Sequence, residues 1–252
     1  MSESPSDARI ALACMDLTSL GEDATPATMA ALARRAHTPY GTPAALCVYP
    51  EMLTATRMSL MREGIAQVRL ATVVNFPDGS SDVERAERET RRAVAAGADE
   101  IDVVFPWRAF LAGDRGGPKQ LISRVKARCG DRVMLKVILE SAAYPSVFEL
   151  AKAASIAVRA GADFLKTSTG KVSGGASPES ARCLLDAITA AGRPVGLKVS
   201  GGIKTLPQAR VYIDLAAAAF GRERVVPGRF RIGASTLLEE LLPVLALEVP
   251  DE

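Results

Sequence analysis

The sequence predicts a single-domain α/β protein, a closed barrel of eight parallel strands surrounded by helices, known as the (β/α)8 or TIM barrel. Eight short, mostly apolar runs recur along the 252 residues, and segments rich in Ala, Arg, Glu and Leu separate them. Runs without strict alternation are typical of parallel strands that helices cover. A doubly wound sheet is the alternative, but the G-x-G-x-x-G turn that usually follows its first strand is missing from this sequence.

The strands are predicted from these apolar runs in chain order. They are residues 11–17, 44–49, 68–75, 100–105, 133–139, 163–169, 195–199 and 229–234. The segments between them have helical character. In residues 81–96, for example, Val83, Ala86, Thr90 and Ala93 recur at helical spacing beside a charged face. Eight such strand–helix units in about 250 residues are typical of one barrel.

Two stretches of the chain resemble each other. Residues 95–102 and 159–166 both show the end of a helix, a terminating glycine and the start of a strand. The similarity reflects either repeat ancestry or the ordinary appearance of such loops. Both explanations support the barrel, and both place Asp102 and Lys166 at corresponding depths in their strands.

Composition bounds the possible partners. Lys and Arg total 31 against 29 for Asp and Glu, without a block of like charge, so nucleic acid is not an expected partner. No apolar run approaches the roughly 18 residues that a membrane span needs, so no membrane association is expected. The polar start of the chain is unlike a secretory signal. No linker divides the chain, so residues 9–252 are predicted to form one catalytic domain and residues 1–8 a disordered tail.

Cysteine and histidine usage limits the chemistry. The four cysteines show no C-x-x-C spacing, which predicts reduced thiols in a cytoplasmic protein. His37 is the single histidine in the sequence. Catalysis by a Ser–His pair is therefore excluded, and a metal site built on histidines is disfavoured.

Ionisable residues interrupt five of the predicted strands, one in each. They are Asp16, Asp102, Lys136, Lys166 and Lys198. Neither the interior of a barrel nor its helix layer accommodates a lone charge easily, so we expect these side chains to converge at the catalytic mouth, at the carboxyl ends of the strands. The alternative is a set of buried ion pairs that only hold strands together, although such pairs add little net stability over apolar packing.

Lys166 is the most informative of these residues. A charged ammonium in an apolar strand costs several kcal/mol unless it is paired or neutral, and a neutral lysine can form a Schiff base with a carbonyl. Lys198 lies on the next strand, and a like charge nearby lowers the pKa of one of the two amines. Spacing does not decide which lysine is the nucleophile. Asp102 is expected to serve acid–base steps with Lys198, and Lys136 to neutralise that carboxylate.

Three loops that follow the sixth, seventh and eighth strands are rich in glycine or small hydroxyl residues. They are residues 167–171, 200–204 and 233–236. Glycine lets the backbone approach an anion closely, and the start of the next helix supplies free N–H groups. A single such loop is an ordinary turn, but three of them at this end of a barrel predict a phosphate site.

The ordered motifs of the chain resemble the 2-deoxyribose-5-phosphate aldolases, a family of class I aldolases with a (β/α)8 barrel. The matching segments are residues 15–18, 47–50, 72–77, 99–104, 135–140, 166–171 and 230–235. The resemblance implies that Lys166 is the Schiff-base lysine, that Lys198 tunes its pKa and relays protons, and that Asp102 is the proton relay. The predicted substrate contacts are Asp16, Thr18, Cys47, Lys136, Thr169, Gly170, Lys171, Gly201, Gly202, Lys204, Gly233 and Ser235.

The resemblance implies reversible cleavage of 2-deoxy-D-ribose 5-phosphate to D-glyceraldehyde 3-phosphate and acetaldehyde, in the catabolism of deoxyribose. It implies no cofactor and no metal, because the covalent imine supplies the activation. The expected partners are the sugar phosphate and aldehyde substrates, and a homo-oligomer is plausible for such barrels. The alternatives are a transaldolase-like lyase, a sugar-phosphate isomerase and a sugar-phosphate binder without activity.

Two features depart from the family pattern. Val199 and Ser200, which follow Lys198, differ from the residues expected there. Some members end in a tyrosine that assists proton transfer, whereas residues 249–252 of this sequence are Val-Pro-Asp-Glu. We expect this second departure to affect the rate of proton transfer and not the type of reaction.

Overall fold

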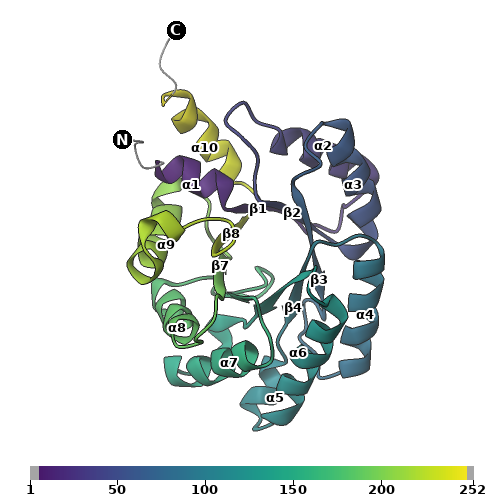
Figure 1. Cartoon of the computed structure of the whole chain (residues 1–252), viewed down its shortest axis with the longest axis vertical. Coiled ribbons are helices and arrows are strands. Elements are labelled where there is room, and N and C mark those ends of the chain that lie inside the picture. Colours follow the sequence, from purple (N-terminus) through teal and green to yellow (C-terminus); the bar gives the residue numbers. More distant parts are fainter. Residues whose placement is uncertain (1–5, 249–252) are drawn as a thin grey trace.

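The structure, a computed structural model, describes residues 6–248, and within them eight parallel strands pair in chain order. β8 pairs back with β1, which closes the barrel (Figure 1). The strands are β1 (Met15–Ser19), β2 (Ala45–Val48), β3 (Arg69–Val74), β4 (Glu100–Val104), β5 (Met134–Ile138), β6 (Phe164–Lys166), β7 (Gly196–Ser200) and β8 (Phe230–Ala234). The predicted (β/α)8 barrel is confirmed.

Helices surround this barrel in Figure 1. They are α1 (Asp7–Ala13), α2 (Pro26–Ala36), α3 (Leu53–Arg62), α4 (Val83–Ala95), α5 (Trp107–Leu111), α6 (Gly116–Cys129), α7 (Val147–Arg159), α8 (Pro178–Thr189), α9 (Leu206–Phe220) and α10 (Leu237–Ala246), with short 3-10 helices η1 (Pro50–Met52), η2 (Ser141–Ala143) and η3 (Arg222–Arg224). The hydroxyls of Thr25, Ser177 and Thr205 cap α2, α8 and α9, and each helix has a proline in its first turn. A Ser or Thr cap with Pro in the first turn is a common helix start, because the hydroxyl accepts from an otherwise unpaired N–H.

The first strand begins later than predicted. Residues 11–13 of the predicted strand 11–17 belong to α1, which Ser6 caps by accepting from the backbone N–H of Arg9. The run from Ile10 to Met15 is apolar without alternation, and periodicity alone does not separate a buried helix from a buried strand. Residues 7 and 8 of the predicted tail are the first residues of α1, and residues 1–5 lie outside the described part of the chain.

The other predicted elements agree more closely with the structure. The remaining strand predictions overlap β2 to β8, and the helical pattern of residues 81–96 corresponds to α4. The largest difference among these strands is at β6, which ends at Lys166 instead of residue 169. Lys166 is therefore the last residue of its strand, at the carboxyl end of the barrel.

The two similar stretches have the same local structure. After α4 and α7 the chain passes through Gly97 and Gly161, whose φ angles are +88° and +106°. These angles lie in the region that residues with a Cβ rarely adopt. The strands β4 and β6 follow, and Asp102 and Lys166 are the third residue of each.

The barrel interior is divided between apolar and charged residues. The main apolar core lies between the strands and the helices, while a smaller cluster of Ala45, Cys47, Ala71 and Val73 fills the side of the interior formed by β2 and β3. Charged side chains occupy the rest of the interior, as described below. Within residues 6–248, no helix is both long and apolar enough to cross a bilayer.

Candidate active site

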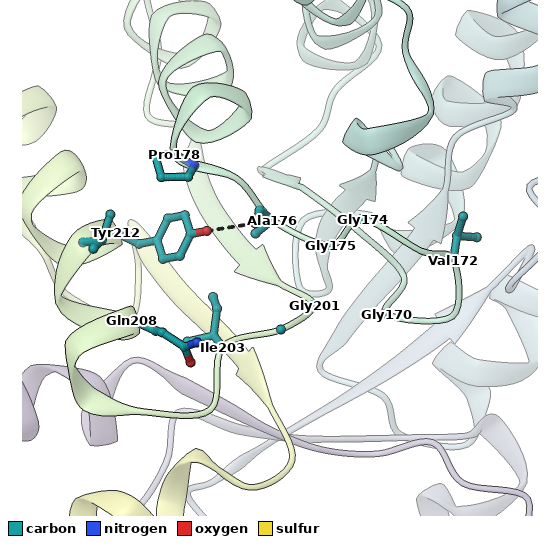
Figure 2. A pocket seen from close by; sticks show the side chains of 12 residues that line it. Gly170, Val172, Gly174, Gly175, Ala176, Pro178, Gly201, Ile203, Gln208 and Tyr212 are labelled. Atoms are coloured by element: carbon teal, nitrogen blue, oxygen red, sulfur yellow. Dashed lines mark hydrogen bonds between the residues drawn. The ribbon is translucent and has the colours of Figure 1, made fainter.

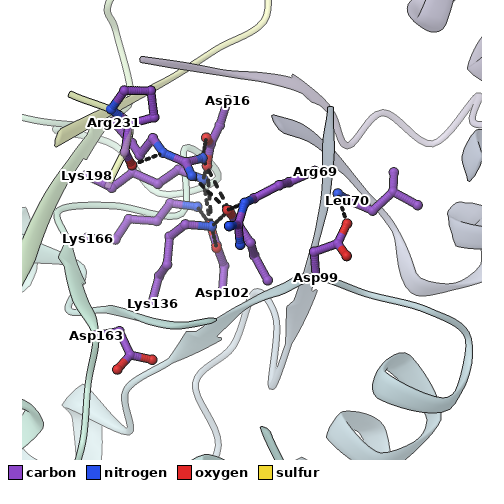
Figure 3. Close-up of polar contacts among 12 residues, drawn as sticks. Asp16, Arg69, Leu70, Asp99, Asp102, Lys136, Asp163, Lys166, Lys198 and Arg231 are labelled. Atoms are coloured by element: carbon purple, nitrogen blue, oxygen red, sulfur yellow. Dashed lines mark hydrogen bonds and ion pairs between the residues drawn. The ribbon is translucent and has the colours of Figure 1, made fainter. Parts of the chain in front are cut away.

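The five ionisable residues predicted from the strands meet inside the barrel (Figure 3). They come from five strands: Asp16 from β1, Asp102 from β4, Lys136 from β5, Lys166 from β6 and Lys198 from β7. Four of these side chains are fully buried, and that of Lys166 is 4% exposed. The sequence therefore predicted five members of this cluster.

Asp102 lies at the centre of the cluster. Its carboxylate accepts hydrogen bonds from Lys166 Nζ at 2.8 Å, Lys198 Nζ at 2.7 Å and Lys136 Nζ at 2.9 Å. The two lysines predicted to approach each other share the same oxygen, Oδ2 of Asp102. This carboxylate can therefore pass a proton between Lys166 and Lys198.

Two further charged residues belong to the cluster, and the sequence reasoning missed both. The guanidinium of Arg231, on β8, donates to Glu100 Oε1 at 2.7 Å and to Asp16 Oδ1 at 2.5 Å. Glu100, on β4, also forms an ion pair with Lys136. The sequence signal for Glu100 and Arg231 was the same as for the other five residues, a charge within an apolar strand. Both residues lie near the start of their strands, however, where charged residues are common.

The lysines of the cluster differ in the direction of their pKa shifts. Burial lowers the pKa of Lys166 below its ordinary value, and the charge of Lys198 lowers it further, against the opposing effect of Asp102. Burial also acts to lower the pKa of Lys136 and Lys198, but the carboxylates around them outweigh it and the pKa of each is raised. Lys166 is therefore the amine of this cluster that most readily becomes neutral.

Asp16 and Asp102 stay ionised. Burial acts to raise the pKa of Asp16 and Asp102, but the surrounding cations hold both well below the usual range. Asp102 receives this effect from Lys136, Lys166 and Lys198. At neutral pH it is thus a hydrogen-bond acceptor that can take up a proton only transiently.

A cavity of about 500 Å³ opens above the cluster, and Lys166 lies at its base. Its lining includes nine of the twelve predicted substrate contacts, together with an arginine, Arg35, from α2. The nine are Thr18, Thr169, Gly170, Lys171, Gly201, Gly202, Lys204, Gly233 and Ser235. The three predicted glycine and hydroxyl loops thus meet around one cavity that holds the candidate nucleophile.

The other three predicted contacts do not line the cavity. Asp16, Cys47 and Lys136 are fully buried and lie within the barrel interior. Burial raises the pKa of the Cys47 thiol, so it is neutral beside the lysines. The structure thus places all three inside the barrel, outside the lining of the cavity.

The loop after β6 is held by a residue that the sequence reasoning did not single out. Glu140, which follows β5, is fully buried with φ +55°, and its carboxylate accepts from the hydroxyl of Thr169 at 2.6 Å. Lys171 Nζ donates to the backbone oxygen of Leu20 at 2.7 Å, which ties this loop to the one after β1. A non-glycine residue at positive φ is uncommon and marks a constrained position.

A second cavity of about 570 Å³ lies beside the first, between the loops after β6 and β7 (Figure 2). The two loops approach so closely that a Cβ on Gly175 would lie 2.5 Å from the backbone oxygen of Gly201. Ala176 joins them, because its N–H donates to Gly201 and its carbonyl accepts from the Tyr212 hydroxyl at 2.9 Å. The expectation about a terminal tyrosine concerns residues 249–252, which lie outside the described part of the chain.

Comparison with known proteins gives one matching family and several similar structures. The sequence model of the family described as DeoC/LacD family aldolase matches residues 10–240. A structure from Toxoplasma gondii ME49, assigned provisionally as a deoxyribose-phosphate aldolase, has 25% sequence identity and a TM-score of 0.86, and the match covers 96% of this chain and 94% of that one. A provisionally assigned deoxyribose-phosphate aldolase from Coccidioides immitis has 27% identity, coverage of 97% and 88%, and a TM-score of 0.82. Deoxyribose phosphate aldolase from Aeropyrum pernix, described as tetrameric, has 28% identity, coverage of 96% and 93%, and a TM-score of 0.76.

Proposed function

Because the chain belongs to the DeoC/LacD family of aldolases, we propose that it is a Schiff-base aldolase that reversibly cleaves 2-deoxy-D-ribose 5-phosphate. The products are D-glyceraldehyde 3-phosphate and acetaldehyde. The observation that carries this proposal is the position of Lys166, a buried amine with a lowered pKa at the base of a cavity and hydrogen-bonded to Asp102. A neutral amine in that position is a nucleophile for a carbonyl carbon.

The chemistry begins when Nζ of Lys166 attacks C1 of the open-chain sugar. Asp102 and Lys198 move the protons that turn the resulting carbinolamine into an iminium ion and water. The iminium then accepts the electron pair of the C2–C3 bond as the C3 hydroxyl loses its proton, and glyceraldehyde 3-phosphate leaves. Protonation of the enamine at C2 and hydrolysis of the iminium release acetaldehyde and restore Lys166.

The phosphate is proposed to bind where the loops after β7 and β8 line the cavity. Gly201, Gly202 and Gly233 allow backbone N–H groups to approach it, and Lys204 lines the same space with positive charge. Arg35 also lines this space and is paired with Glu239 of α10. Thr236, at the start of α10, makes no side-chain cap to that helix, whereas α8 and α9 are capped by their own side chains. The N–H groups of the first turn of α10 therefore stay available to an anion.

The test is reductive trapping with acetaldehyde and borohydride, followed by peptide mapping with mass spectrometry. We expect a two-carbon adduct on the peptide that contains Lys166, and no adduct there in Lys166→Ala. Lys119→Ala is the matched control, because Lys119 is an exposed lysine on α6 and its loss should leave the adduct unchanged.

The alternatives give different results in the same experiment. An adduct on Lys198 in place of Lys166 would reverse the roles of the two lysines. A protein that binds deoxyribose 5-phosphate but forms no adduct would be a sugar-phosphate isomerase or a binding protein. A protein that forms the adduct but cleaves only other sugar phosphates would be a lyase of the transaldolase kind.

We extend the proposal to the setting of the enzyme. All four cysteines are free thiols, as reducing compartments keep them, so we propose that the enzyme acts in the cytoplasm in the catabolism of deoxyribose. We also propose a homo-oligomer, on the similarity to the tetrameric Aeropyrum pernix protein. Cell fractionation and light scattering test these two points, and a monomer at working concentration would contradict the second.

A further inference from the structure

Six buried charged side chains form a closed ring beneath the cavity, and their charges alternate in sign. The successive pairs are Asp102–Lys198 at 2.7 Å, Lys198–Asp16 at 2.5 Å, Asp16–Arg231 at 2.5 Å, Arg231–Glu100 at 2.7 Å, Glu100–Lys136, and Lys136–Asp102 at 2.9 Å. Each carboxylate in the ring lies between two cations, and each cation between two carboxylates. Alternation of this kind lets every charge be paired on both sides in a site that water does not reach.

Lys166 is attached to this ring but is not a member of it. Among residues 6–248 its ion-pair partner is Asp102, at 2.8 Å. The three carboxylates of the ring balance its three cations, so the ring is neutral as it stands. A proton on Lys166 would therefore add a positive charge that no carboxylate of the ring is left to balance, and an unbalanced buried charge is costly.

We propose that Glu100 and Arg231 are positioning residues whose opposite charges complete the ring and so decide that Lys166 is the amine that loses its proton. This inference rests on the proposed function and adds two residues to it. Neither side chain lines the cavity, and both are buried, so neither touches the substrate. Glu100 and Arg231 act on Lys166 through the residues between them and it, Asp16, Lys136 and Asp102.

The environment of Arg231 fits a fixed charge. Its Nε donates to the backbone oxygen of Pro227 at 2.6 Å, and its guanidinium lies 6.0 Å from the centre of the Phe164 ring. Gly196 makes this possible, because a Cβ there would lie 2.3 Å from that ring. Carboxylates and the neighbouring side chains thus hold the guanidinium in place, and arginine stays charged throughout the working pH range.

Other titratable groups around the ring do not alter the charge balance. Cys47 from β2 has a raised thiol pKa and stays neutral. Arg69 from β3 reaches Glu100 at 3.8 Å, but half of its side chain is exposed, so solvent screens its charge. The charged group that faces the ring from β6 is Lys166 itself, and those on β1, β4, β5 and β7 are members of the ring.

The proposal predicts opposite effects for the two residues. Arg231→Met leaves the ring with a net negative charge, which favours the proton on Lys166 and moves the acid limb of kcat/KM to higher pH by about one unit. Glu100→Gln leaves a net positive charge and moves the limb to lower pH by about one unit. The double variant restores neutrality, so its limb should return close to that of the wild type.

The experiment measures the rate of acetaldehyde and cyanoborohydride trapping at Lys166 against pH, alongside kcat/KM, for these three variants and the wild type. Arg69→Met is the matched control, because it removes an exposed cation from the same carboxylate and should leave the limb in place. Arg231→Lys keeps the charge and should also keep the limb near its wild-type position. If Arg231→Met does not fold, Glu100→Gln and Arg231→Lys decide the question.

The outcomes separate this inference from the proposed function. Opposite shifts that cancel in the double variant support the ring. Shifts in the same direction, or unshifted limbs in variants that still form the Lys166 adduct, would overturn the ring and leave the aldolase proposal standing. A wild-type protein that forms no adduct at Lys166 at any pH would overturn both.

Discussion

At the scale of single residues, position along the strand decides what each lysine of the cluster can do. Lys136 and Lys198 lie inside their strands and are fully buried, whereas Lys166 is the last residue of β6 and lines the cavity. The first two keep raised pKa values, because carboxylates surround them, and Lys166 has a lowered one. The same residue type therefore supplies two amines that hold their protons in the resting enzyme and one candidate nucleophile.

Asp102→Asn separates proton transfer from imine formation. The amide cannot accept protons from three lysines, so we expect kcat to fall by at least about a hundredfold. Loss of this carboxylate also removes the group that raises the pKa of Lys166, so acetaldehyde should still be trapped there. Steady-state kcat and the trapped adduct are measured on the same preparation.

Asp163→Asn is the control for this substitution. Asp163 lies just before β6 but pairs with Lys126 at 2.7 Å, away from the charged cluster, so its loss should leave kcat unchanged. Asp102→Asn with undiminished kcat would remove that residue from the mechanism.

At the scale of elements, the loops after β6 and β7 are packed backbone to backbone. Gly175, with φ +49°, and Gly201, with φ +91°, meet where side chains would not fit. The cavity that holds Lys166 is lined by both of these loops. Their contact therefore sets the width of the candidate substrate site.

Gly175→Ala is expected to push the two loops apart. The added Cβ would lie 2.5 Å from the backbone oxygen of Gly201, which cannot move without its loop. We expect KM for the sugar phosphate to rise by about tenfold, a loss of about 1.4 kcal/mol in binding, with kcat less affected. Steady-state kinetics measure both constants.

Gly192→Ala is the matched control for the loop prediction. Gly192 also has a positive φ, +67°, but a Cβ there meets nothing within 4 Å, and it follows α8 at the opposite end of the barrel. It shares the backbone strain without the clash, so KM should stay at its wild-type value. Equal KM values in the two variants would show that the close approach is unimportant.

At the scale of the whole molecule, the barrel interior combines an apolar side with a charged side. Small residues of β2 and β3 fill one side, and the ring with Lys166 fills the other. Since the ring joins β1, β4, β5, β7 and β8, the ionisation of its carboxylates is coupled to closure of the barrel. Stability is therefore expected to depend on pH.

The expected dependence follows from the direction of the pKa shifts. Asp16 and Asp102 have folded-state pKa values below their ordinary ones, so their contribution to stability is complete above about pH 5 and is lost as the pH falls further. We expect Tm to change little from pH 8 to about pH 5 and then to fall steeply. Thermal unfolding followed by circular dichroism measures it, and a flat Tm down to pH 3 would contradict the ionised ring.

The sequence alone determined the barrel, the strand positions within a few residues and five members of the charged cluster. It did so because isolated charges in apolar runs are a local signal and eight alternating units allow few folds. The choice of Lys166 over Lys198 came from the family resemblance. The geometry fits that choice, because Lys166 lines the cavity and Lys198 does not.

The tertiary structure decided the rest. The contacts of Arg231 with Asp16 and Glu100 join residues 215 and 131 positions apart, and no local pattern shows such pairings. The start of β1 was ambiguous in sequence because helix and strand bury an apolar run equally well. Depth in the barrel placed Cys47, Asp16 and Lys136 away from the cavity. Sequence names the residues that carry charge, but only closure of the barrel determines which charges meet and which amine is left without a balancing carboxylate.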